Sequence, residues 1–275
     1  MSPEDRALVW PPAINRDTPA WRTLGTLLRE TPPSADQNRL IVFGSAALQL
    51  TVASNLLSAD IDISLDVVTV GPRGMTTPRA EEHLRRAAAK VNASLGKDLP
   101  YIQVCHWMTF QPANRWERRA FEKIEGGWRL VYPHPYDTLF SKLRRAETKD
   151  IEAFRVVIER TGHPTEGEFI QLCIENYRDF EPRLRTAPSH VPEVVPSHDL
   201  RSNTVRLWQA IWGRSIDIDR EITGPALQQL QTDWVDYDPA LADELARCAQ
   251  VPRNKGIPQR KGEDPSGPEN KSPPR

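Results

Sequence analysis

The sequence predicts an α/β (α+β) fold that is followed by a helical C-terminal region and a disordered tail. In the first 165 of 275 residues, short apolar or alternating segments take turns with amphipathic helical segments. Helical segments continue beyond that point and are interrupted by a proline-rich stretch at 181–197. From residue 251 the chain contains Pro, Gly, Lys and Glu with almost no apolar residues, which is typical of disorder.

The strands are expected where short runs are apolar or alternate in polarity. Residues 60–68 alternate most clearly. The Glu-Gly-Gly sequence at 125–127 predicts a hairpin turn between two such runs. The expected strands are 40–43, 60–68, 101–110, 121–124 and 128–132.

The helices are expected where apolar residues recur every three to four positions. Thr18 is a candidate cap for the first of them, and residues 78–95 carry acids in the first turn and bases later, as the helix dipole favours. The expected helices are 18–31, 46–53, 78–95, 135–145, 148–160, 166–177 and 199–212, with two more within 224–250. We therefore expect a flexible arm at 1–17, a main domain at 18–165, a helical region at 166–250 and a tail at 251–275.

The composition excludes several classes of protein. Hydrophobic residues make up 39% of the chain, and the net charge is -1, which argues against indiscriminate coating of nucleic acid and against an acidic disordered chain. The three cysteines, Cys105, Cys173 and Cys248, form neither a disulfide framework nor a zinc-binding pattern, so a reducing cytoplasm is expected. The N-terminus lacks a signal-peptide core, and the uncharged stretch 40–59 holds too many polar residues to cross a membrane.

Carboxylates gather on one face of the strand expected at 60–68. Alternate side chains of a strand share a face, so Asp60, Asp62 and Asp66 lie together with Ser64, opposite an apolar face. Clustered acids repel one another, and a divalent cation such as Mg²⁺ or Mn²⁺ would relieve the repulsion. The alternative is a sheet face that is simply solvated.

A second pattern precedes this strand. Gly44 and Ser45 stand where the apolar strand 40–43 turns into a helix. A glycine permits close approach of the backbone, and Ser45 with the first amides of the helix would hold a phosphate.

The order Gly-Ser, short helix and Asp-x-Asp strand resembles the nucleotidyltransferase (polymerase-beta-like) superfamily. The resemblance implies a small mixed sheet with flanking helices over residues 18–165. It also implies that Gly44 and Ser45 contact the phosphates of a nucleoside triphosphate (NTP), and that Asp60 and Asp62 hold Mg²⁺ or Mn²⁺. Two-metal chemistry would then activate the acceptor hydroxyl and stabilise the pyrophosphate leaving group.

A downstream segment resembles AbiE-type toxin nucleotidyltransferases and related uncharacterised bacterial families. Lys142 precedes Arg145, and Lys149-Asp150 begins the next expected helix. The resemblance implies that Lys142, with Arg145 and Lys149, binds the nucleotide and that Asp150 supports the catalytic site. A structural explanation is also open, because apolar residues at helical spacing surround Lys142 and an acid is favoured in the first turn of a helix.

The chain departs from the family pattern at two points. A third carboxylate is expected on a later strand, but residues 101–107 offer Gln103, Cys105 and His106 instead. The second acid of the downstream motif is replaced by Ala153, next to Glu152. The general base is therefore open between Asp150 and Asp66, and a weakened site is an alternative.

The two resemblances imply an enzyme that transfers a nucleoside monophosphate from an NTP to RNA, such as tRNA, or to a protein, as a toxin or phage-defence component with a cognate antitoxin. The alternatives are a weakened protein of the same fold that binds nucleotide or a partner without turnover, and a structural interaction module.

Residues 70–165 carry 17 basic and 11 acidic side chains, a local surplus that suits a polyanionic substrate. The basic candidates there are Arg115, Arg118, Arg119, Lys142, Arg144 and Arg145.

Overall fold

The computed structural model of the chain describes residues 8, 10–33, 38–65, 78–106, 109–180 and 200–237. The expected linker at 181–197, the tail at 251–275, residues 238–250 and Asp66 lie outside the described residues. Residues 1–227 cluster into one compact unit and residues 228–275 into a second. The expected main domain and the first helices of the expected C-terminal region therefore belong to one compact unit.

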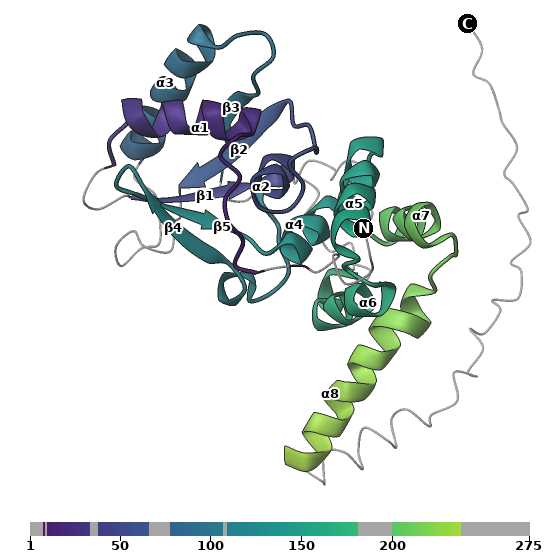
Figure 1. Cartoon of the computed structure of the whole chain (residues 1–275). Helices are drawn as coiled ribbons and strands as arrows, with labels where there is room; N and C mark the ends of the chain where they lie inside the picture. Colours follow the sequence, from purple (N-terminus) through teal and green to yellow (C-terminus); the bar gives the residue numbers. More distant parts are fainter. Residues whose placement is uncertain are drawn as a thin grey trace, which may run out of the picture. The chain divides into compact units, whose positions relative to one another are not determined.

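A five-stranded mixed sheet forms the centre of the first half of the chain (Figure 1). Its strands are β1 (Arg39–Phe43), β2 (Asp60–Leu65), β3 (Tyr101–Val104), β4 (Phe121–Glu125) and β5 (Trp128–Tyr132). The spatial order is β3-β2-β1-β5-β4, with β2 antiparallel to β1 and parallel to β3. The β1–β5 pair is parallel, and β4 and β5 form the predicted hairpin. The predicted α+β class is confirmed.

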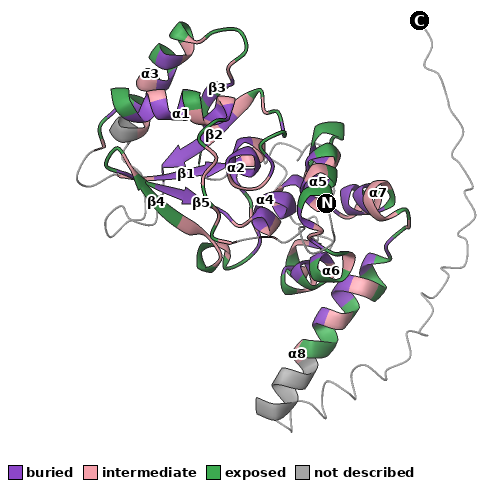
Figure 2. Cartoon of the chain, in the orientation of Figure 1, coloured by how far each residue is buried: buried purple, intermediate pink, exposed green. Residues whose placement is uncertain are grey.

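Three helices build the core against one face of the sheet. They are α1 (Pro19–Glu30), α2 (Gly44–Thr51) and α3 (Pro78–Ser94). The apolar side of α1 packs with the inward side chains of the four strands β1, β2, β3 and β5, and the described part of α3 joins the same cluster. Figure 2 shows β1, β2 and β5 largely buried, whereas the edge strand β4 is largely exposed and the other edge strand, β3, is exposed at alternate residues. Because alternate residues of β1, β2, β3 and β5 are buried in this core, the side chains between them lie on the opposite face of the sheet.

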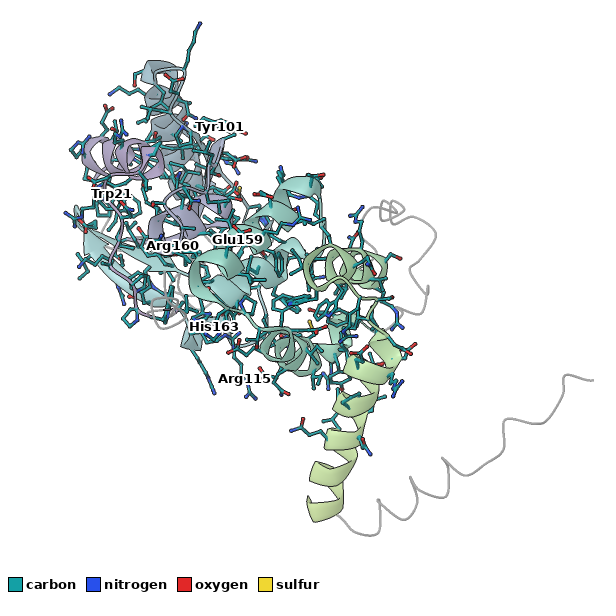
Figure 3. All side chains as sticks on the ribbon, turned by 45° about the vertical axis from the view of Figure 1, so that its right-hand side comes forward. Trp21, Tyr101, Arg115, Glu159, Arg160 and His163 are labelled. Carbon is teal, nitrogen blue, oxygen red and sulfur yellow. The ribbon has the colours of Figure 1, made fainter. Side chains whose placement is uncertain are left out.

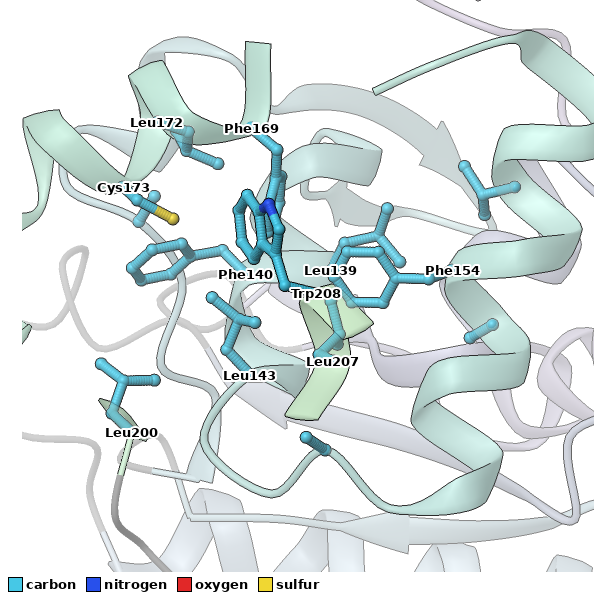
Figure 4. Packing of buried hydrophobic residues seen from close by; sticks show 14 of the residues in the cluster. Leu139, Phe140, Leu143, Phe154, Phe169, Leu172, Cys173, Leu200, Leu207 and Trp208 are labelled. Carbon is cyan, nitrogen blue, oxygen red and sulfur yellow. The ribbon is translucent and has the colours of Figure 1, made fainter. Parts of the chain in front are cut away.

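A second core joins the helices that follow the sheet. They are α4 (Pro135–Lys142), α5 (Thr148–Thr161), α6 (Glu166–Glu175) and α7 (Leu200–Trp212), and they pack around fully buried Phe140, Phe154, Phe169 and Trp208 (Figure 4). Helix α8 (Gly224–Tyr237) begins in the first unit and continues into the second. Because Leu48 of α2 also belongs to this core, α2 is held between the sheet and the helices.

Some boundaries differ from those expected. Residues 10–17 of the expected flexible arm are packed: Trp10 donates to the Arg119 carbonyl at 2.7 Å and Asn15 N–H donates to the Leu50 carbonyl at 2.9 Å. Strand β3 ends at Val104, since the Cys105 N–H makes the last bond to β2, at Ile63. Among the described helices, none combines the length and the apolar character needed to traverse a lipid bilayer.

Candidate functional site

The turn from β1 into α2 brings the backbone against the carboxylate strand. Gly44 has a φ of +70°, which disfavours any side chain, and a Cβ placed on it would lie 2.5 Å from the Asp62 Oδ2. Ser45 follows in the first turn of α2. The pairing of Phe43 with Asp62 in the β1–β2 register sets this proximity. A side chain at position 44 would therefore be disfavoured by the backbone conformation and would displace the Asp62 carboxylate.

Asp60 and Asp62 lie on the face of β2 opposite the buried Ile61 and Ile63. Their hydrogen bonds come from weak or distant neutral donors. The Cys105 thiol lies 3.5 Å from Asp62 Oδ1, and the Tyr101 hydroxyl lies 3.5 Å from Asp60 Oδ2. The Ser58 hydroxyl is 3.4 Å from the other oxygen of Asp60. The pair is thus partly buried without a direct cationic partner in the described part of the chain.

This arrangement perturbs the ionisation of its groups. Burial and then the charge of Asp60 raise the pKa of Asp62, against the opposing effects of the Cys105 thiol and the positive charges of Lys142 and Arg145. Burial and the negative charge of Asp62 raise the pKa of the Cys105 thiol to about 12. The site therefore favours an added positive charge beside Asp62.

A buried cationic cluster lies next to Ser45. Lys142, at the end of α4, donates from Nζ to Ser45 Oγ at 3.0 Å and to Asp150 Oδ1 at 3.0 Å. Arg145 donates from Nε and Nη2 to the two oxygens of Asp150, each at 2.8 Å. The side chain of Lys142 is 6% exposed and that of Asp150 is fully buried, whereas Arg145 is 46% exposed. Glu147 also pairs with Arg145, at 3.5 Å, so Lys142 and Arg145 face two anions. The cluster carries a surplus positive charge only if the exposed Lys149, which pairs with Glu147 at 3.7 Å, is counted with it.

Asp150 is held as a carboxylate. Burial raises its pKa, but the hydrogen bonds from Arg145 and the charge of Lys142 outweigh that effect and bring the pKa to about 2. Asp150 also accepts from the Glu147 N–H at 3.1 Å, which completes a capping box at the start of α5. Both oxygens are therefore committed to protein donors, and this occupancy favours a positioning role for Asp150 over a proton-accepting one.

Lys142 has the opposite tendency. Burial lowers its pKa, and the negative charge of Asp150 works against this lowering. An ammonium group has three N–H donors, and two of them are used by Ser45 and Asp150. The third N–H has no acceptor in the part of the chain that the structure describes.

The remaining predicted residues lie away from this cluster. Lys149 is 63% exposed and pairs with Glu147 at 3.7 Å. Glu152 is exposed and faces Arg155, whereas Ala153 is fully buried in the helical core. In the segment 70–165, where basic side chains outnumber acidic ones, Arg119 pairs with buried Asp137. Arg144 of the same segment pairs with Asp179. The structure therefore brings together Gly44 with Asp62, and Ser45 with Lys142, Arg145 and Asp150, but does not bring Lys149 into contact with them.

No third carboxylate stands beside the Asp60–Asp62 pair in the described chain. Gln103 is opposite Asp62 in the β2–β3 register, and Tyr101 is opposite Asp60. No group of three or more His, Cys, Asp or Glu residues with metal-binding geometry occurs among the described residues. The donor set still fits a hard divalent cation, because two carboxylates on one strand face lack a cationic partner there and one of them has a raised pKa.

The sequence did not assign a role to Tyr101, in β3, or to Cys105, which follows the end of this strand. Tyr101, labelled in Figure 3, is 47% exposed beside Asp60, and buried Cys105 contacts Asp62. The alternation of the strand at 101–104 would have placed Tyr101 and Gln103 on one face, but only the pairing with β2 shows that this face holds the acids.

Comparisons of the chain with protein-family models, with characterised proteins and with solved structures yield no match. No matched protein therefore assigns a role to the residues of this site.

Proposed function

We propose that this chain is a metal-dependent nucleotidyltransferase, which transfers a nucleoside monophosphate from an NTP to a hydroxyl group of an RNA or protein acceptor. One observation carries the proposal: Lys142 bridges Ser45, at the start of α2, and Asp150, while Gly44 of the same turn lies against Asp62. A cationic cluster and an acidic pair from three separate segments thereby meet at one helix start.

The cationic cluster is suited to the triphosphate. The open donor of Lys142, the exposed part of Arg145 and the hydroxyl of Ser45 would bind phosphate oxygens, and the amides at the start of α2 would add their partial positive charge. Asp150 would hold Lys142 and Arg145 in place. The bound triphosphate would therefore lie with its charge close to the acidic pair.

Asp60 and Asp62 would hold Mg²⁺ or Mn²⁺ between themselves and the triphosphate. When bound, such an ion neutralises phosphate charge and lowers the pKa of the attacking hydroxyl. In the reaction, the acceptor oxygen forms a bond to the α-phosphorus and the bond from the α-phosphorus to the bridging oxygen breaks, so pyrophosphate leaves. The acceptor would approach from the side of β3, where Tyr101 and Gln103 are exposed.

The test is incubation of the protein with radiolabelled NTPs, Mg²⁺ and total cellular RNA. Wild-type protein is expected to label an acceptor, and Asp60→Ala/Asp62→Ala protein is expected to lose the label. Asp98→Ala is the matched control, because Asp98 is an exposed acid in the loop before β3. Equal labelling by the double variant and the wild type would refute a catalytic role for the two acids.

A second candidate function is nucleotide binding without turnover. It is favoured by the neutral Gln103 opposite Asp62 and by Ala153 in the helical core. In that case NTP would raise the thermal unfolding midpoint equally with and without divalent metal, and no labelled product would form. Metal-dependent stabilisation together with a labelled product would exclude this candidate.

A further inference from the structure

The connection between α4 and α5 carries Arg145 and includes one residue in a strained conformation. Ala146 has a φ of +47°, in the left-handed region that non-glycine residues rarely adopt. Its side chain is buried in the helical core. Such a conformation persists only where the surroundings hold it. The residues that hold this connection therefore determine where Lys142, Arg145 and Asp150 lie.

Helix α7 supplies side chains that bind the backbone of this connection. Asn203 donates from Nδ2 to the Arg144 carbonyl at 2.8 Å, and Arg206 donates from Nη2 to the Arg145 carbonyl at 2.9 Å. Arg206 also donates to Asn203 Oδ1 at 3.1 Å, which orients the carboxamide. Asn203 is buried and Arg206 is exposed. Two consecutive carbonyls, immediately before Ala146, are thus fixed by one helix face.

Arg145 is consequently held at both ends. Its guanidinium is fixed by Asp150, and its carbonyl is fixed by Arg206. Loss of the second contact would let the backbone at Ala146 relax from the left-handed region and would move the guanidinium away from its place near Lys142 and Asp62. A displacement of about 1 Å in a binding group is enough to weaken binding or catalysis strongly.

We propose that Asn203 and Arg206 of α7 are positioning residues for the triphosphate, acting through Arg145; this inference rests on the proposed function. The two side chains touch neither the acidic pair nor the Ser45 hydroxyl. Their role is to set the backbone from which Arg145 reaches the ligand. The helical region is thereby part of the nucleotide-binding machinery and not only a separate packing unit.

The attachment of α7 does not depend on these hydrogen bonds. Leu200, Leu207 and Trp208 lie beside the buried Asn203 on α7 and anchor the helix in the helical core. Trp208 also donates to Glu166 at 2.7 Å. Removal of the exposed Arg206 side chain is therefore expected to leave the fold intact, so that a binding defect is separable from unfolding.

The experiment measures binding of inorganic tripolyphosphate with Mg²⁺ by calorimetry, together with KM and kcat for NTP. Tripolyphosphate is used because it does not depend on base preference. Arg206→Ala is expected to weaken tripolyphosphate binding and raise KM about tenfold, with an unchanged thermal midpoint and a smaller change in kcat. Arg206→Lys, which retains a donor, is expected to restore most of the binding.

Arg155→Ala is the matched control. Arg155 is likewise exposed and donates to a backbone carbonyl of α7, at Ala210, at 3.3 Å. Asn203→Ala tests the buried partner, and its folding is checked by circular dichroism.

Unchanged binding in Arg206→Ala, or an equal loss in Arg155→Ala, would overturn the positioning role. Loss of binding in Arg206→Ala, with no transfer by the wild type, would overturn the transferase function and leave the positioning role in place.

Discussion

Replacement of Gly44 by alanine is expected to have two distinct effects. The backbone conformation lowers the stability of the fold, and the added Cβ displaces the Asp62 carboxylate. The φ of +70° costs an alanine about 1–2 kcal/mol in the folded state. The added Cβ would also lie 2.5 Å from Asp62 Oδ2. That oxygen is the end of a rotatable side chain, so the contact is expected to be relieved by movement of the carboxylate and to add little to the loss of stability.

Gly213→Ala provides the comparison. Gly213 has the same φ of +70°, but a Cβ there meets nothing within 4 Å. Both variants are expected to lose about 1–2 kcal/mol in urea unfolding. Only Gly44→Ala is expected to lose nucleotide transfer, by a factor on the order of 10². Wild-type transfer by Gly44→Ala, or an equal loss by Gly213→Ala, would refute the argument that the glycine makes room for Asp62.

Three further outcomes test the electrostatics and packing. The pKa of Asp150 near 2 lies below its ordinary 3.8, so its ion pairs stabilise the fold above about pH 4 and lose this effect as the pH falls towards 2. As the pH falls from about 4 to about 2, the free energy of unfolding of the wild type, measured in urea, is expected to decrease by about 2 kcal/mol more than that of Asp150→Asn. Phe154→Ala, in the helical core, is expected to cost about 3–5 kcal/mol in urea unfolding; a cost below 1 kcal/mol would contradict the packing. Burial raises the pKa of the Cys105 and Cys173 thiols, so iodoacetamide at about pH 8 is expected to modify neither until the protein unfolds, as peptide mass spectrometry would detect.

Local sequence patterns predicted most of the elements but not their arrangement. Strand β2 was predictable because its acids and isoleucines alternate, and the turn at 125–127 was predictable from its glycines. The parallel pairing of β1 with β5 joins residues about 90 positions apart, and no local pattern specifies it. The end of β3 was misjudged because a strand ends where its partner stops pairing, not where its apolar residues stop.

The same limit applies to the site. The spacing of Gly44, Ser45, Asp60 and Asp62 made these residues candidates, and a resemblance made Lys142 one; the structure shows that they lie close together. The contacts of Asn203 and Arg206 were not identifiable, because their acceptors are backbone carbonyls. Every residue has a carbonyl, so such an acceptor leaves no signature in the sequence.

Asp150 has two structural roles. The same carboxylate begins helix α5 through the Glu147 N–H and anchors Lys142 and Arg145. Single substitutions at Lys142 and Asp150 should therefore be non-additive, because the two side chains form one buried pair and loss of Asp150 leaves the buried Lys142 without its ion pair. Joint replacement by apolar residues is expected to cost less than the sum of the single replacements, but it still removes the hydrogen bond from the Glu147 N–H and the ion pair of Arg145. In evolutionary terms, Lys142 and Asp150 are expected to change together when either one changes.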